Sequence, residues 1–155
     1  MKLLALTIGA LLSWGSVHAE TVRNVAVYNL ENGVGLKGYD PVAVFPEGGS
    51  AAQPGKEEFQ LDYLGVIYKF ASSEHMEMFM QNPAKYEPTY GGWCAYAMAS
   101  GEYIDIQPTL FTIHGNRAHY FVAARAKRNF DSDVAGFEAR ADGHWKRISG
   151  EDPRL

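Results

Sequence analysis

Residues 68–95 constrain the fold more than any other part of the chain, because strong breakers divide them into short pieces. Ser72 or Ser73 is a suitable N-cap for a helix, and Asn82-Pro83 ends that helix because proline cannot continue it. Gly91-Gly92 then interrupts the chain again, just before its only cysteine. This spacing excludes a long helix here and predicts several short elements packed together.

The apolar periodicity places short helices between these breaks. The helix after the serine cap turns Met76, Phe79 and Met80 towards the core, whereas Met78 is expected to point elsewhere. Pro83 can start a short second turn, and small residues predict a further helix over 93–100.

Alternating apolar residues predict two β-hairpins, one over 59–70 and one over 110–122 with its turn at Gly115-Asn116. Helical composition follows over 123–129 and 133–148. The sequence therefore predicts an α+β fold, in which small antiparallel hairpins are covered by several short helices. The residues after 149 are expected to fray. The expected core is Phe59, Leu61, Tyr68, Phe70, Phe79, Tyr86, Trp93, Phe111, Ile113, Phe121, Phe137 and Trp145.

The first residues have the pattern of a secretory signal peptide. Lys2 precedes an apolar run over 3–14, which is shorter than the roughly 20 residues needed to span a bilayer, and Ala19 closes a small-x-small cleavage site. Cleavage after Ala19 would leave a single domain over 20–155, exported to the periplasm or secreted; an uncleaved anchor is the alternative. No later stretch has the apolar character of a transmembrane helix.

Charge and motif content narrow the function further. The formal net charge is −4, so the basic footprint of a nucleic-acid-binding protein is missing. No Ser–His–Asp nucleophile motif, phosphate-binding loop, dinucleotide fingerprint or CxxC occurs. These features favour a non-enzymatic protein that does not bind nucleic acid.

The tract 59–86 resembles the YHS module, also described as TRASH-like, and residues 25–145 resemble a family of exported single-domain YHS proteins. The core module would span about 59–100. The residues that carry the resemblance are Gly38-Tyr39-Asp40-Pro41-Val42-Ala43, Tyr68, Phe70-Ala71-Ser72, Phe79, Asn82-Pro83, Lys85-Tyr86, Pro88, Tyr90-Gly91-Gly92, Cys94-Ala95, Ala141-Asp142 and Trp145.

The resemblance implies a metal site, but the chain departs from the pattern. In the metal-associated branch of the family, cysteines stand where this chain has Ala43, Ala71 and His75. A thiolate-rich copper or zinc site is therefore not expected. The exported branch carries its cysteine at the position of Cys94 instead.

The candidate metal ligands are Cys94, His75 and Met98, and the expected ion is of the copper type, because thiolate, imidazole and thioether groups suit copper. Each has a simpler interpretation. Cys94 could be a small buried apolar residue, His75 a surface histidine, and the methionines core residues. A redox role for Cys94 is a further alternative, and it would require an accessible thiol beside a basic group.

Other polar residues are interpreted structurally. His114 and His119 would lie diagonally on one face of the second hairpin, where they could bridge a metal, but a solvated polar face is the simpler interpretation. Asp40 is expected to bind backbone N–H groups of a turn. A protein-interaction surface around Tyr90 and Trp93 is the alternative to metal binding.

Overall fold

The computed structural model describes residues 23–154, so the predicted signal peptide over 1–19 lies outside the described residues. The fold is α+β, as predicted, and within this range it contains one mixed sheet, one two-stranded hairpin and short helices around them. No helix among the described residues has the length and apolar character needed to cross a bilayer. The elements are η1 Val25–Val27, β1 Leu30–Glu31, β2 Val34–Gly35, η2 Leu36–Gly38, η3 Pro46–Gly48, β3 Lys56–Tyr63, β4 Val66–Phe70, α1 Ser73–Gln81, α2 Pro83–Tyr86, η4 Thr89–Gly92, α3 Ala95–Met98, β5 Gln107–His114, β6 Arg117–Phe121, α4 Ala124–Asp131 and α5 Val134–Ser149.

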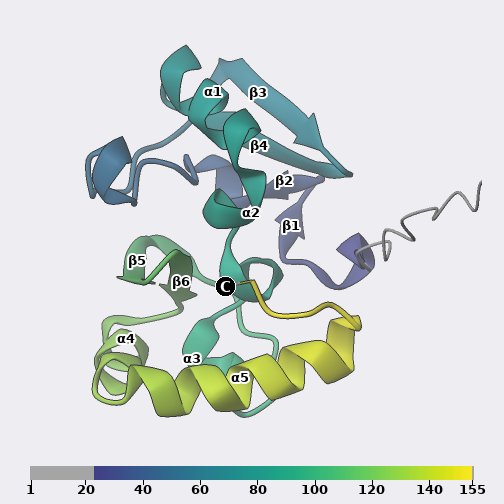
Figure 1. Cartoon of the computed structure of the whole chain (residues 1–155), viewed down its shortest axis with the longest axis vertical. Coiled ribbons are helices and arrows are strands. Elements are labelled where there is room, and N and C mark those ends of the chain that lie inside the picture. Colours follow the sequence, from purple (N-terminus) through teal and green to yellow (C-terminus); the bar gives the residue numbers. More distant parts are fainter. Residues whose placement is uncertain (1–22, 155) are drawn as a thin grey trace, which may run out of the picture.

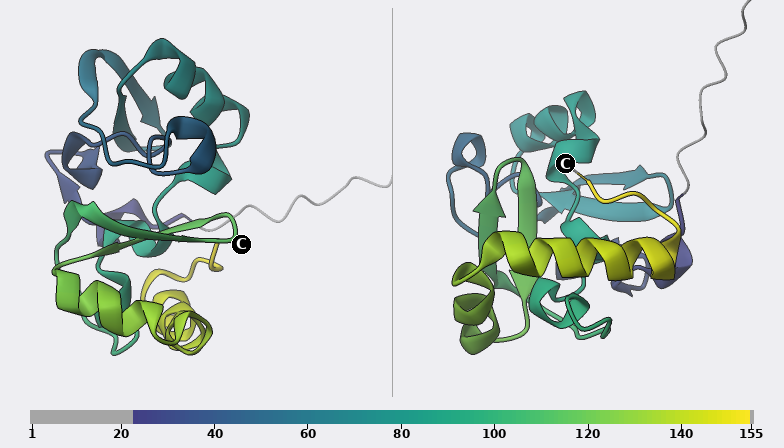
Figure 2. Two further views of the ribbon diagram at one scale, coloured as in Figure 1. Left: turned by 90° about the vertical axis from the view of Figure 1, so that its left-hand side faces the viewer. Right: turned by 60° about the horizontal axis from the view of Figure 1, so that its bottom comes forward.

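The elements form two halves with a hairpin between them (Figure 1). The first half contains β1–β4 with α1 and α2, and the second contains α3, α4 and α5. The β5–β6 hairpin lies between the halves, as the left view of Figure 2 shows. Both faces of this hairpin therefore meet other parts of the chain.

The mixed sheet has the strand order β1-β2-β4-β3, with β2 parallel to β4 and β3 antiparallel to β4. The predicted hairpin over 59–70 is confirmed, and β3 begins slightly earlier, at Lys56. Its turn falls at Leu64-Gly65, where both residues have positive φ angles. The Asp62 carboxylate accepts a hydrogen bond from the Gly65 N–H and fixes this turn.

Helix α1 begins as predicted after Ser72, whose hydroxyl accepts a hydrogen bond from the His75 N–H. Phe79 is fully buried against the aromatic rings of β3 and β4. The prediction that Met80 faces the core is wrong, because Met80 is 50 % exposed while Met78 packs against the core. Helix α1 is rotated so that its inner face also carries His75, one turn before Phe79.

The second hairpin has the predicted register, in which His114 pairs with Arg117 and Thr112 with His119. Every residue of β6 is buried. His119 has no exposed surface, so the interpretation of its face as solvated is wrong. Its ring packs on Phe130 of α4, because the helices of the second half cover the face that a lone hairpin would expose to water.

The predicted core is half confirmed: Tyr68, Phe70, Phe79, Tyr86, Phe121 and Trp145 are buried. The other six predicted residues are only partly buried and pack around that centre. Buried residues that were not predicted include Tyr28, Leu36, Tyr90 and Phe130. Many of these lie in irregular segments, where periodicity gives no signal.

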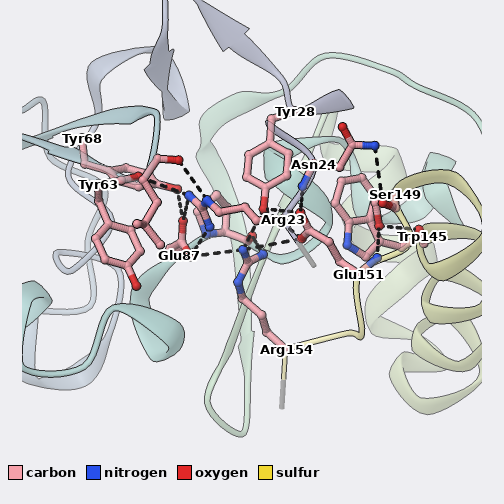
Figure 3. Close-up of polar contacts among 12 residues, drawn as sticks. Arg23, Asn24, Tyr28, Tyr63, Tyr68, Glu87, Trp145, Ser149, Glu151 and Arg154 are labelled. Atoms are coloured by element: carbon pink, nitrogen blue, oxygen red, sulfur yellow. Dashed lines mark hydrogen bonds and ion pairs between the residues drawn. The ribbon is translucent and has the colours of Figure 1, made fainter. Parts of the chain in front are cut away.

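The C-terminal tail is ordered against the body, so the prediction that it frays is wrong. Arg154 donates hydrogen bonds to Glu87 and to the Tyr28 hydroxyl, and Glu151 accepts one from Tyr28. Arg23 donates to Glu87 from the opposite end of the described chain. Figure 3 shows these residues as one network, which we call the Glu87 network. It ties both ends of residues 23–154 to the loop after α2.

Candidate functional site

The Asp40 carboxylate organises the first half of the molecule. It is buried, and its Oδ1 accepts hydrogen bonds from the backbone N–H groups of Val42 and Ala43, at 2.8 and 3.2 Å. Its Oδ2 accepts a third from the N–H of Ala71, at 2.8 Å. The structural role expected for Asp40 is therefore present, and the carboxylate joins the turn after Pro41 to the end of β4.

His75 completes this arrangement. Its Nδ1 lies 2.5 Å from Asp40 Oδ2, and its side chain is only 14 % exposed. The interpretation of His75 as a surface histidine is therefore wrong. Because a carboxylate only accepts hydrogen bonds, Nδ1 carries the proton, and a neutral ring then has its lone pair on Nε2. The ring orientation and tautomer are thus set by a carboxylate that is itself held by backbone N–H groups.

Three positions from two distant segments meet at this carboxylate. They are Ala43, Ala71 and His75, the positions at which the metal-associated YHS branch is expected to carry cysteine. In this chain, two of them contribute backbone N–H groups to Asp40 and the third contributes an imidazole. The Asp40 carboxylate therefore gathers two backbone N–H groups and one imidazole from these three positions.

Tyr120 lies on β6 and forms an isolated parallel bridge with Cys94. Its side chain is 2 % exposed, and its hydroxyl has no hydrogen-bond partner among the described residues. Burial raises the pKa of Tyr120, and the charge of Asp40 raises it further. The sequence did not single out the Tyr120 hydroxyl, because its burial depends on the packing of distant segments.

Cys94 and Met98 lie in the second half and are both fully buried. The Met98 N–H donates to the Cys94 carbonyl, so the two residues lie one helical turn apart on α3. His75 lies on α1 and is bound to Asp40. Because Cys94 has no exposed surface, its thiol is not readily accessible from solvent. Within residues 23–154, no group of three or more His, Cys, Asp or Glu side chains is placed to hold a metal ion.

A second polar cluster surrounds Glu138 of α5, which was not predicted. Its carboxylate accepts from His119 Nε2 at 2.6 Å and from His114 Nδ1 at 3.1 Å. Burial opposes ionisation, but the two histidines together with Arg117 lower the pKa of Glu138 to about 2. Burial lowers the pKa of His119. The two histidines therefore meet at a carboxylate, as their diagonal placement allowed.

Arg117 argues against a cation in this second cluster. Its Nη1 lies 3.6 Å from Glu138 Oε1, and its guanidinium also pairs with Asp142 at 2.6 Å. The Tyr90 hydroxyl donates to Asp142 and accepts from Arg117. A fixed positive charge beside Glu138 repels a metal ion, so this cluster is best explained as the polar contact between β6, η4 and α5.

Hollows in the described part of the chain include two with polar or sulfur-bearing walls. One, of about 390 Å³, has Cys94, Tyr96, Ile104 and Ala126 in its walls. The other, of about 310 Å³, is lined by residues of the Glu87 network. The Glu87 carboxylate there already accepts hydrogen bonds from Arg23, Tyr68 and Arg154, which indicates a structural role.

The exposed apolar groups do not lie at Tyr90, where the interaction surface was predicted, but at neighbouring residues. Tyr90 is buried and cannot contact a partner. Trp93 is partly buried and packs edge-on against Tyr103, which is 47 % exposed. The neighbouring Ile104 is 37 % exposed. The exposed apolar groups of this region therefore lie on the loop after α3.

The Asp40–His75 pair is the arrangement with the clearest chemical capacity. A carboxylate that holds one imidazole nitrogen leaves the other oriented to bind a metal ion or to accept a proton. Comparisons of the chain with protein-family models, with curated proteins and with solved structures find no match.

Proposed function

We propose that this protein is an exported, non-enzymatic YHS-type module that binds a copper-type metal ion through His75. The observation that carries the proposal is the contact between His75 Nδ1 and Asp40 Oδ2. Histidines that bind metals usually donate their other ring N–H to a carboxylate or carbonyl, which fixes the ring and raises its basicity. Asp40 supplies such a carboxylate, and its own position is fixed by three backbone N–H groups.

The remaining predicted ligands are Cys94 and Met98. A thiolate and a thioether are soft donors that favour Cu(I) over harder ions, and the two residues share one turn of α3. Both are fully buried, so their participation requires a local opening around α3. His75 is therefore the primary ligand in this proposal, and the two sulfur groups are secondary ones.

The test is an anaerobic Cu(I) titration of the processed protein, residues 20–155, against a chromophoric chelator. The wild type should bind one ion. His75→Gln should lower the affinity by about tenfold or more, since even an outer-shell partner is typically worth 10–100-fold. His114→Gln is the matched control, because His114 is the exposed histidine of the Glu138 cluster. Cys94→Ala and Met98→Leu then show whether sulfur takes part.

Equal competition by the wild type and His75→Gln would overturn the proposal. The alternative function would then be an accessory module that contacts another exported protein. Tyr103 and Ile104 are the exposed apolar residues to mutate for that alternative. A pull-down with Tyr103→Ser beside the wild type would test it.

A further inference from the structure

The β5–β6 hairpin has an inner and an outer strand. Strand β6 is the inner one, because its far side is already used: Tyr120 forms a bridge with Cys94 there. On the same side, the Ala118 carbonyl accepts a hydrogen bond from the Thr89 hydroxyl. Among the described strands, β5 pairs only with β6, and Figure 1 shows it on the outer side of the hairpin. The outer edge of β5 is therefore a place where a further strand could add.

The register shows which backbone groups of β5 point away from β6. In an antiparallel pair, opposite residues alternate between those that exchange hydrogen bonds and those that do not. His114 and Arg117 flank the two-residue turn and form a hydrogen-bonded pair there, so the pairs that contain Ile113 and Phe111 are the other kind. The N–H and C=O groups of Ile113 and Phe111 therefore point outwards. Within residues 23–154, no hydrogen bond to these groups occurs.

The composition of β5 leaves this edge open to pairing. Edge strands are commonly protected from association by charged side chains. Strand β3, at the edge of the mixed sheet, is protected in this way, since it carries Lys56, Glu57, Glu58 and Asp62. By contrast, residues 107–114 of β5 contain no Asp, Glu, Lys or Arg, and residues 110–113 are partly exposed. An uncharged strand with free backbone groups can accept a partner strand.

We propose that the outer edge of β5 pairs with β5 of a second copy of this chain, in antiparallel orientation, about a twofold axis at Thr112. This inference goes beyond the proposed function and does not depend on it. With Thr112 opposite Thr112 of the second copy, Phe111 of each chain lies opposite Ile113 of the other. Each such pair exchanges two hydrogen bonds. All the outward N–H and C=O groups of these residues are then paired.

A second copy fits this edge because the pattern of donors and acceptors is self-complementary. Each outward residue finds its partner in the other outward residue of the same strand, as an isologous twofold interface requires. An uncharged strand also meets its own copy without like-charge repulsion. The two hairpins would thereby join into one continuous antiparallel sheet.

The first test reads the register by disulfide cross-linking. Thr112→Cys and His114→Cys are compared, each with Cys94→Ala so that the introduced thiol is the only one. The proposed pairing puts the two copies of residue 112 directly opposite, within the Cα separation of about 4.4–6.8 Å that a disulfide needs. Residue 114 lies opposite residue 110, so its two copies are about 14 Å apart, at about 3.4 Å per residue. Under mild oxidation with diamide, Thr112→Cys should form covalent dimers at least about tenfold faster than His114→Cys.

The second test measures association by sedimentation of the processed protein, residues 20–155, over a range of concentrations. The wild type should form dimers as the concentration rises. Ile113→Pro removes the outward N–H, and proline is tolerated at a strand edge where that N–H faces solvent. Ile113→Ala is the matched control, because it also shortens the side chain but keeps the N–H. The dimer of Ile113→Pro should be weaker than that of Ile113→Ala by about tenfold or more, since one hydrogen bond is lost from each chain.

Three results would overturn the inference. They are a wild type that stays monomeric at about 1 mM, equal cross-linking of the two cysteine variants, and equal association of folded Ile113→Pro and Ile113→Ala. Thermal unfolding of all variants shows which are folded, and if Ile113→Pro is not, the cysteine variants decide the outcome. A monomeric wild type that binds Cu(I) through His75 would overturn the second copy alone and leave the proposed function intact.

Discussion

Replacing Asp40 with asparagine tests the link between the fold and the candidate site. The substitution keeps the shape of the side chain and changes one oxygen into an amide group. In the better orientation, Asn Oδ1 still accepts from Val42 and Ala43, and the new NH₂ takes the place of Oδ2. That NH₂ then faces the Ala71 N–H, which is a donor too. In the flipped orientation two backbone N–H groups lose their acceptor, so the first orientation should prevail.

The loss of stability can be worked out from these contacts. The orphaned Ala71 N–H costs about 1–3 kcal/mol, and a hydrogen bond to a charged group, such as that of His75, contributes about 1.5–3 kcal/mol, part of which a neutral bond replaces. Asp40→Asn should therefore lose about 2–4 kcal/mol of unfolding free energy. That is a large part of the roughly 5–15 kcal/mol typical of a domain. Asp152→Asn, at an exposed position, should lose less than about 1 kcal/mol.

The substitution also predicts a change in the tautomer of His75. The amide donates to Nδ1, so the ring proton must move to Nε2, the nitrogen proposed to bind metal. Urea unfolding followed by tryptophan fluorescence measures the first effect, and ring ¹⁵N NMR, assigned with His75→Gln, measures the second. An Asp40→Asn variant within about 1 kcal/mol of the wild type, or with an unchanged tautomer, would refute this reasoning.

Three other outcomes follow from the structure. Glu87→Gln removes the buried charge between two arginines and should lower the free energy of unfolding, measured with urea, by about 3–5 kcal/mol. The control is Glu57→Gln, whose exposed carboxylate pairs with Lys69 and whose loss should be no more than about 1 kcal/mol. Similar losses for the two variants would contradict the role of the Glu87 network. The folded-state pKa of Glu138, about 2, lies below its unfolded value of about 4.5, so its contribution, on the order of 2–3 kcal/mol, is present above pH 4.5 and is lost as the pH falls towards 2. Across that pH range, the free energy of unfolding measured with urea should change less with pH for Glu138→Gln than for the wild type. Equal slopes against pH would count against this contribution. Cys94, with no exposed surface, should react with a thiol reagent only as fast as the protein opens; rapid stoichiometric labelling in native buffer would show that the thiol is accessible.

Local signals in the sequence predicted the elements well. The cap at Ser72, the break at Pro83 and the two hairpin turns depend on residues only a few positions apart, and the structure has them all. The same signals were misleading where another part of the chain covers a surface. Both faces of β6 are buried because the second half packs against the hairpin, and periodicity within one strand does not contain that information.

The candidate site was only partly predictable for the same reason. His75 was identified through the resemblance and Asp40 as a turn residue, but 35 positions separate them and nothing local pairs them. Nothing local marks the Tyr120 hydroxyl, because its surroundings come from distant segments such as that of Cys94. Cys94 and Met98 are four residues apart and could be paired from helical spacing, whereas their complete burial depends on the packing of α3 against α4 and α5.

The Glu87 network holds the two ends of the described chain close together. Arg23 donates to both carboxylate oxygens of Glu87, and Arg154 donates to Oε2, so the two ends of the described residues lie within two side-chain lengths of each other. A short peptide joining residues 23 and 154 would preserve their positions. New N- and C-termini could then be placed in the exposed loop at Gly49-Ser50. Circular permutation is tolerated best where the ends are close and the new opening is exposed. The order of the elements along the chain is therefore separable from their arrangement in space.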